Sequence, residues 1–235
     1  MSAVFEKALE LSLKGEYIEA IMFLRREGDT RNPKTWILIG RSYCHVEGEA
    51  FQAIKAFQEA KRLNPQCIAA YTFLARTYEN LGKPMRAEEI IDEGLRENPG
   101  SAELWEAKAS CCMNRSNFIE AFQIAENLEQ EDTVAACKIR ARANGIYAQE
   151  DNDLQILREA LANWDAAINL NPEDFESWMG KAEILSFMGN YNGAIKAVNH
   201  VLKLVPGYKV AKEMKEELIH ERKQNARFLR FIPKL

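Results

Sequence analysis

Proline and glycine are scarce in this chain of 235 residues, which contains 7 prolines and 12 glycines. An all-β chain of this length needs a turn every ~10 residues and therefore many more of both. Hydrophobic residues make up 47% of the chain and charged residues 28%, a composition that excludes disordered and collagen-like proteins. We therefore expect an all-α globular protein.

The chain also lacks an excess of positive charge. Lysine and arginine number 31 against 35 aspartates and glutamates, which gives a formal net charge of −4. A protein with this balance has no basic field to attract nucleic acid or anionic lipid. The composition predicts that nucleic acid is not the partner.

Long hydrophobic runs are missing as well. Glu6, Lys7 and Glu10 interrupt the first residues, so a signal peptide is not expected. Elsewhere, charged residues cut every apolar run well before the ~20 residues that a transmembrane helix needs. These observations predict a cytoplasmic protein that does not insert into membranes.

Cysteine and histidine do not show the spacings of metal or redox sites. No pair of cysteines forms a C-x-x-C motif, and the three histidines lie far apart without an H-E-x-x-H motif. A Gly-rich phosphate loop and a G-x-S-x-G nucleophile motif are also absent. We therefore expect reduced thiols, no metal, no cofactor and no catalytic centre. The cysteines are Cys44, Cys67, Cys111, Cys112 and Cys137.

The chain is organised by an internal repeat. Asn-Pro or similar pairs end at Pro33, Pro65, Pro99, Pro172 and Pro206. The intervals are 32, 34, 73 and 34 residues, so the long interval has room for two repeats and about five further residues. Apolar residues between these prolines follow the period of two successive helices. Each repeat is therefore expected to form a helical hairpin.

This pattern resembles the tetratricopeptide repeat, a helix-turn-helix unit of about 34 residues written W-x₂-L-G-x₂-Y, A-x₃-F and P. The second repeat shows it with Trp36, Gly40, Tyr43, Ala53, Phe57 and Pro65. The fourth and sixth repeats begin with Trp105 and Trp178 at the same position. The resemblance implies an all-α, right-handed α-solenoid of about six hairpins with a C-terminal capping helix. The expected repeats span about residues 1–33, 34–66, 67–100, 101–132, 133–173 and 174–206, followed by a cap and basic tail over 207–235.

Small residues recur where paired helices must approach each other closely. The tryptophan positions are expected to fill the space between successive repeats. The small residues are Gly40, Ala75, Ala109 and Ala182 on first helices, and Ala20, Ala53, Ala87, Ala121, Ala160 and Ala194 on second helices.

Two segments depart from the repeat. In the fifth repeat the surplus residues are expected near the acidic turn of residues 150–153, either as a lengthened helix and loop or as an insert that contacts a partner. The capping helix is expected to turn Val210, Met214, Leu218 and Glu221 inward. The tail then combines bases with large apolar residues, and it either packs on its own cap or docks on an acidic or apolar surface. These residues are Arg222, Lys223, Arg227, Arg230 and Lys234, with Phe228, Leu229, Phe231 and Ile232 between them.

The resemblance implies a non-enzymatic scaffold or adaptor whose concave groove, lined by first helices, holds an extended peptide or a partner helix. The alternatives are a subunit that assembles through convex or terminal surfaces and, more distantly, an enzyme. Groove positions follow by register one, five and eight residues after the tryptophan position. They are Ile37, Arg41, Cys44, Thr72, Arg76, Glu79, Glu106, Ser110 and Met113, with Met179, Glu183 and Ser186 in the sixth repeat.

The charges in this groove predict its partner. The family's best-studied mode clamps the carboxylate of a chaperone tail, but Leu38 and Phe73 occupy positions where that mode needs polar side chains. Arg41 and Arg76 instead share one register position in adjacent repeats, and two guanidinium groups suit carboxylates or phosphates of an acidic segment. The alternative interpretation is that the arginines pair with Glu79 or with water.

Overall fold

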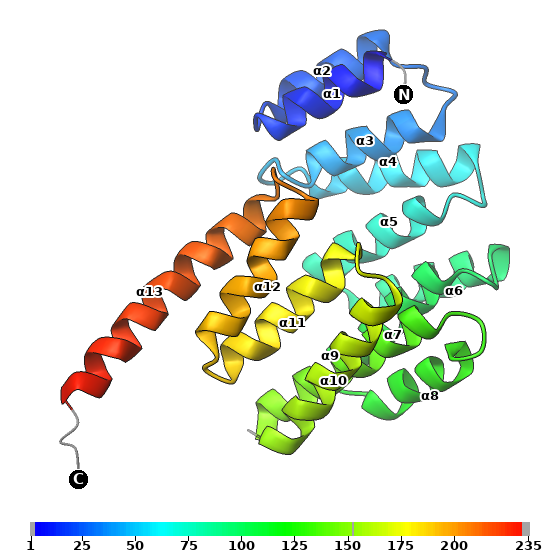
Figure 1. The fold of residues 1–235 in the computed structure, drawn as a ribbon. Helices are drawn as coiled ribbons and strands as arrows, with labels where there is room; N and C mark the ends of the chain where they lie inside the picture. Colours follow the sequence, from blue (N-terminus) through cyan, green and yellow to red (C-terminus); the bar gives the residue numbers. More distant parts are fainter. Residues whose placement is uncertain (1–2, 152, 232–235) are drawn as a thin grey trace. The chain divides into compact units, whose positions relative to one another are not determined.

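The computed structural model describes residues 3–151 and 153–231, and the side chains of these residues except 150, 151 and 225–231. The described residues form helices and no strand, which confirms the all-α prediction (Figure 1). The helices are α1 (Ala3–Leu13), α2 (Tyr17–Glu27), α3 (Pro33–Tyr43), α4 (Ala50–Leu63), α5 (Ile68–Asn80), α6 (Pro84–Glu97), α7 (Ala102–Asn114), α8 (Phe118–Leu128), α9 (Thr133–Asp151), α10 (Leu154–Leu170), α11 (Phe175–Phe187), α12 (Tyr191–Leu204) and α13 (Lys209–Phe231).

The chain divides into two compact units. The N-terminal unit spans Met1–Arg115 and the C-terminal unit spans Ser116–Leu235. Within the N-terminal unit, α1 packs on α2, α3 on α4 and α5 on α6; within the C-terminal unit, α9 packs on α10 and α11 on α12. Helices α1, α3, α5, α9 and α11 are therefore the first helices of hairpins, as the repeat pattern predicts. The division into an array of residues 1–206 and a cap of 207–235 stays a prediction.

The small residues lie where the sequence pattern places them. All the alanines of that set, and Gly40, are buried. Two close contacts show why glycine is needed on some helices. A Cβ atom on Gly40 would lie 2.4 Å from Phe57, and one on Gly180 would lie 2.2 Å from Trp164. Aromatic rings of the second helices therefore press directly on the backbone of the first helices.

Replacing Gly180 with alanine is expected to destabilise the protein by about 1–3 kcal/mol, because the new methyl group overlaps the rigid ring of Trp164. The matched control is Gly145→Ala in α9, where the new Cβ meets the flexible end of Ile184. There the gain in helix propensity offsets the contact, and the change is expected to be below about 1 kcal/mol. Urea unfolding followed by circular dichroism measures both variants. Equal stability of the two variants would contradict the packing of Gly180 against Trp164.

The aromatic position near the start of the first helix has a repeated role that the sequence did not reveal. In four hairpins its N–H or O–H donates to the backbone carbonyl six residues earlier, and so fastens the helix to the preceding loop. Tyr71 is buried, whereas the three tryptophans are half-buried and fill the space between hairpins less completely than predicted. The bonds are Trp36 to Thr30 (2.9 Å), Tyr71 to Pro65 (2.8 Å), Trp105 to Pro99 (2.9 Å) and Trp178 to Pro172 (2.9 Å).

The irregular fifth repeat has the lengthened first helix that was one of its two expected forms, but its turn starts later than predicted. Residues 150 and 151 belong to α9, so this part of the expected acidic turn is helical. Asp153 caps the next helix, because its carboxylate accepts from the backbone N–H groups of Gln155 (2.8 Å) and Ile156 (3.3 Å). Residue 152 lies outside the described residues, and partner contact at this segment stays a prediction.

The capping helix α13 presents a slightly different inward face from the one predicted. Ala211 and Leu218 are buried and Met214 is half-buried, but Val210 and Glu221 are exposed. The inward face thus starts one residue later than predicted and ends before Glu221, whose charge favours water. The side chains of the tail from residue 225 onward lie outside the described part of the chain. Among the described helices, none is long and apolar enough to cross a membrane.

Candidate binding surface

The first helices α3, α5 and α7 of the N-terminal unit are joined by side-chain contacts from one hairpin to the next. The guanidinium of Arg41 lies 5.5 Å from the ring centre of Phe73. The Thr72 hydroxyl donates to Glu103 at 3.3 Å. We call the set of exposed and half-buried residues along these helices the first-helix face. It comprises Arg41, Cys44, Thr72, Phe73, Arg76, Glu79, Glu103, Glu106, Ser110 and Asn114.

Most of the predicted groove residues lie on this face, but two do not. Arg41, Cys44 and Arg76 are exposed, and Thr72, Glu79, Glu106 and Ser110 are half-buried. Ile37 and Met113, in contrast, are buried. Ile37 packs into the hydrophobic cluster that joins α3 to α5.

These two residues are therefore corrections to the predicted site. Burial of a large apolar side chain is worth about 1.5–3 kcal/mol, so both serve packing rather than partner contact. In the C-terminal unit, Met179 is likewise buried, Ser186 is half-buried and Glu183 is exposed.

Glu79 is engaged with α7 and not with an arginine. Its carboxylate accepts from the Asn114 side-chain amide at 2.8 Å and lies 3.5 Å from the Cys111 sulfur. The pairing of Arg41 or Arg76 with Glu79, one of the two alternatives left by the sequence, is thus not the geometry found. Phe73 and Asn114 were missed by register reasoning, since neither occupies one of the three positions it considered.

Cys44 lies near both arginines. Shielding of its sulfur from water raises the pKa of the Cys44 thiol, while the positive charges of Arg76 and Arg41 act in the opposite direction. The sulfur lies 3.8 Å from the Thr77 hydroxyl. That hydroxyl donates to the Phe73 carbonyl at 2.7 Å, so the Cys44 thiol is the donor in this contact. Both guanidinium groups therefore act on one exposed residue.

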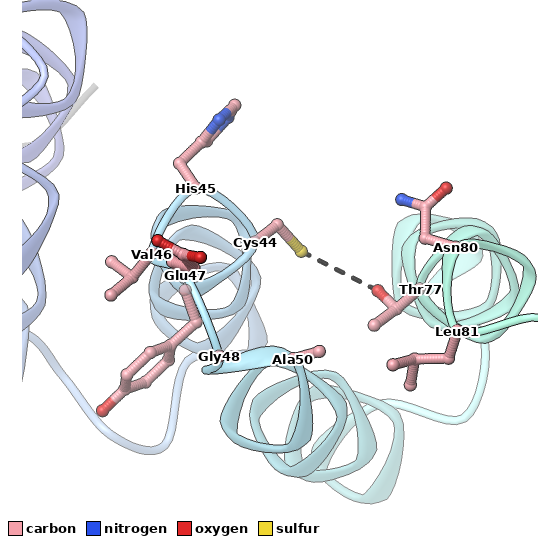
Figure 2. Close-up of a pocket in the computed structure, with 10 residues that line it drawn as sticks. Cys44, His45, Val46, Glu47, Gly48, Ala50, Thr77, Asn80 and Leu81 are labelled. Atoms are coloured by element: carbon pink, nitrogen blue, oxygen red, sulfur yellow. Dashed lines mark hydrogen bonds between the residues drawn. The ribbon is translucent and has the colours of Figure 1, made fainter.

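A hollow of about 330 Å³ adjoins Cys44 at the carboxyl ends of α3 and α5. Figure 2 shows Cys44 pointing toward Thr77, with Ala50 at the start of α4 and Leu81 at the end of α5. Its lining mixes apolar side chains with the polar side chains of Cys44, His45, Glu47, Thr77 and Asn80.

The charges around Cys44 predict how fast it reacts with a thiol reagent. Alkylation needs the thiolate, so the rate is expected to rise with pH around a midpoint above that of a free cysteine, because shielding raises the pKa. Replacing Arg41 and Arg76 with glutamate removes the opposing positive charges and is expected to move the midpoint higher still. Mass spectrometry of iodoacetamide labelling between neutral and alkaline pH measures it. A midpoint unchanged by the double substitution would contradict the placement of both arginines beside the thiol.

The first helices of the C-terminal unit carry a different pattern. Lys138 of α9 lies 2.9 Å from Glu176 and 3.7 Å from Asp174, and Arg142 lies 3.6 Å from Glu176. These ion pairs fasten α9 to α11. Cationic groups here are engaged with neighbouring carboxylates, in contrast to the arginines beside Cys44.

Successive helical hairpins whose first helices line one face are typical of α-solenoids, and this chain has that arrangement. Residues 47–111 and residues 175–208 match family models described as tetratricopeptide repeat. The first match covers α4, α5, α6 and most of α7, and the second covers α11 and α12. Two stretches of the chain, one in each unit, are therefore tetratricopeptide repeats, as the sequence pattern predicts.

Solved structures and a curated relative agree with this fold. Yeast Tom70 is 18% identical, with a TM-score of 0.62 over 88% of this chain and 44% of that chain. The human IFIT1 dimer with m7Gppp-AAAA is 17% identical, with a TM-score of 0.61 over 93% of this chain and 51% of that chain. The α-solenoid prediction is thereby confirmed.

Among curated proteins, the chain is 25% identical to the human protein O-mannosyl-transferase TMTC1 over 207 residues. The match covers 87% of this chain and 22% of the relative. The chain thus spans about a fifth of the length of this relative.

Proposed function

We propose that the first-helix face of the N-terminal unit binds an extended segment of a protein partner, with an acidic or phosphorylated residue between Arg41 and Arg76. The observation that carries the proposal is that Arg41 and Arg76 are both exposed on successive first helices, with Arg41 stacked over Phe73 and the exposed Cys44 near both. Two guanidinium groups near one accessible point suit a carboxylate or a phosphate. The tetratricopeptide repeat fold supports a role in protein interaction in general.

The contacts of the arginines leave them able to bind. Arg41 covers the ring of Phe73, and a guanidinium stacked on a ring keeps the N–H groups at its edge available. Glu79, the nearest candidate for a competing carboxylate, already accepts from Asn114. A carboxylate of the partner would therefore meet donors that are held in place rather than neutralised.

The face also changes sign along its length, which gives the partner a direction. Arg41 and Arg76 lie on α3 and α5, whereas Glu103 and Glu106 lie on α7. A segment that runs from α3 toward α7 would thus place acidic residues first and basic or hydroxyl residues later. Complementary charges of this kind fix register and increase the association rate more than they increase affinity.

The proposal is for a non-enzymatic scaffold in a reducing, cytoplasmic environment. The five cysteines are free thiols, which supports such an environment. O-mannosyl transfer belongs to the name of the relative, of which this chain covers about a fifth, and we do not extend it to this chain. IFIT1 was solved with m7Gppp-AAAA, but the mixed charges of the first-helix face favour a protein segment over nucleic acid.

Selection from a random peptide display library on the immobilised full chain tests the proposal. We expect enriched peptides to share acidic residues, and we expect the Arg41→Glu, Arg76→Glu variant not to retain them. Enrichment of the same peptides on both proteins would show that another surface binds them. A lack of any enrichment would contradict peptide binding itself.

A further inference from the structure

A row of exposed apolar side chains follows the edge of the N-terminal unit where the hairpins turn. The second residue of α2, of α4 and of α6 is Ile18, Phe51 and Met85, which are 56%, 63% and 61% exposed. Met22, one helical turn after Ile18, is 65% exposed. We call these four residues the edge row. Single exposed apolar residues are ordinary, but a repeated position in three successive hairpins is not.

The three helices that carry the edge row are neighbours. Ile21 and Leu24 of α2 share one hydrophobic cluster with Ala56 of α4. Lys61 of α4 forms an ion pair with Glu93 of α6 at 2.8 Å. Ile18, Phe51 and Met85 occupy the same position on these three successive second helices, so we treat them as one strip.

Acidic side chains flank one end of this strip. Glu16 and Glu19 adjoin Ile18, and Glu47 and Glu49 precede Phe51. None of the ion pairs within the described residues uses these four glutamates. Positive charge lies toward the other end. Lys83 and Arg86 adjoin Met85 in the sequence, Arg115 contacts the Met85 sulfur, and Lys55 lies one helical turn after Phe51. Arg86 is paired with Glu89, and Arg115 with Glu88.

The chain itself contains a segment with the complementary chemistry. Residues 223–235 include four bases and no acid, and they carry large apolar residues between those bases. We infer that the edge row of one copy binds residues 223–235 of a second copy. The apolar side chains would cover Ile18 and Phe51, and the bases would face the acidic end of the strip. Surfaces of opposite sign at two places on one chain favour head-to-tail contact between copies. The residues concerned are Lys223, Arg227, Arg230 and Lys234, with Phe228, Leu229, Phe231 and Ile232.

Complementation between two variants tests this inference. The first variant lacks residues 225–235, and the second carries Ile18→Asp and Phe51→Asp at exposed positions, where the fold does not depend on the side chains. Sedimentation velocity of the full chain is expected to show a mass that increases with concentration. Each variant alone is expected to remain monomeric, and an equal mixture of the two is expected to associate, because one keeps the row and the other keeps the tail.

Matched controls distinguish this contact from nonspecific hydrophobic association. Leu170→Asp with Phe187→Asp removes two exposed apolar side chains of the C-terminal unit and is expected to leave association unchanged. A labelled peptide of residues 223–235 is expected to bind the tail-less chain at least about tenfold more tightly than the same chain with Ile18→Asp and Phe51→Asp. Added salt is expected to weaken this binding, since the acidic groups are exposed.

Three results would overturn the inference. One is a tail-less chain that still self-associates. Another is a mixture of the two variants that stays monomeric although circular dichroism shows both to be folded. The third is a full chain that is monomeric at every concentration while its tail-less form binds the peptide, which would place the segment on its own copy.

Discussion

Replacing Phe57 with alanine is expected to lower the free energy of unfolding by about 3–5 kcal/mol. Phe57 is fully buried within α4, and its ring stacks on that of Phe73 with the ring centres 5.5 Å apart. The ring also lies against the backbone of Gly40, where no side chain is present to fill the space that its removal would leave. The loss therefore includes both the transfer of the ring to water and the cavity that remains.

Urea unfolding followed by circular dichroism measures this loss, and Phe51→Ala is the matched control. Phe51 belongs to the same helix and to the same residue type, but it is exposed. Its replacement, studied at low protein concentration, is expected to change stability by no more than about 0.5 kcal/mol. A loss below about 1 kcal/mol for Phe57→Ala would show that the core of the N-terminal unit is packed differently.

Reversing the charge at Arg41 and Arg76 together is expected to weaken binding of a selected acidic peptide by about 2–5 kcal/mol. The two cations are then replaced by carboxylates that repel the acidic residue. Stability is expected to change little, because both arginines are exposed and neither contributes to the buried core. Isothermal titration and thermal melting of the same preparations measure the two effects.

The matched control reverses Arg31 and Arg96, which are exposed residues outside the first-helix face. This variant has the same net charge as the Arg41→Glu, Arg76→Glu protein. We expect it to bind the peptide nearly as tightly as the parent at physiological salt, because distant exposed charges are screened. Equal weakening in both variants would assign the effect to net charge rather than to the two arginines.

The fold followed from the sequence because its signals are local and repeated. Prolines near the ends of five of the six repeats and small residues at fixed positions specify hairpins, although the other side chains vary. The surplus residues predicted a longer α9 but not where this helix ends. Residues 150 and 151 resemble a turn by composition, yet they continue a helix whose length is set by packing against α10.

The candidate site followed from the sequence only in part. Register placed Arg41, Cys44 and Arg76 at exposed positions, because the helical period fixes direction. It failed at Ile37, since the position after Trp36 faces the next hairpin and its apolar side chain joins the core. The contacts of Arg41 with Phe73 and of Glu79 with Asn114 depend on side-chain conformation across two hairpins, which the period of one helix does not specify.

Protection of Cys44 from alkylation is the measurement that tests partner binding at the first-helix face most directly. All five cysteines lie in the described part of the chain, and Cys44 is the exposed one, so it reports on this face alone. Half-buried Cys67, at the start of α5, serves as the internal reference. With the full chain saturated by a selected acidic peptide, alkylation of Cys44 is expected to slow severalfold while that of Cys67 is unchanged. Alkylation of Cys44 at the same rate with and without bound peptide would contradict binding between Arg41 and Arg76.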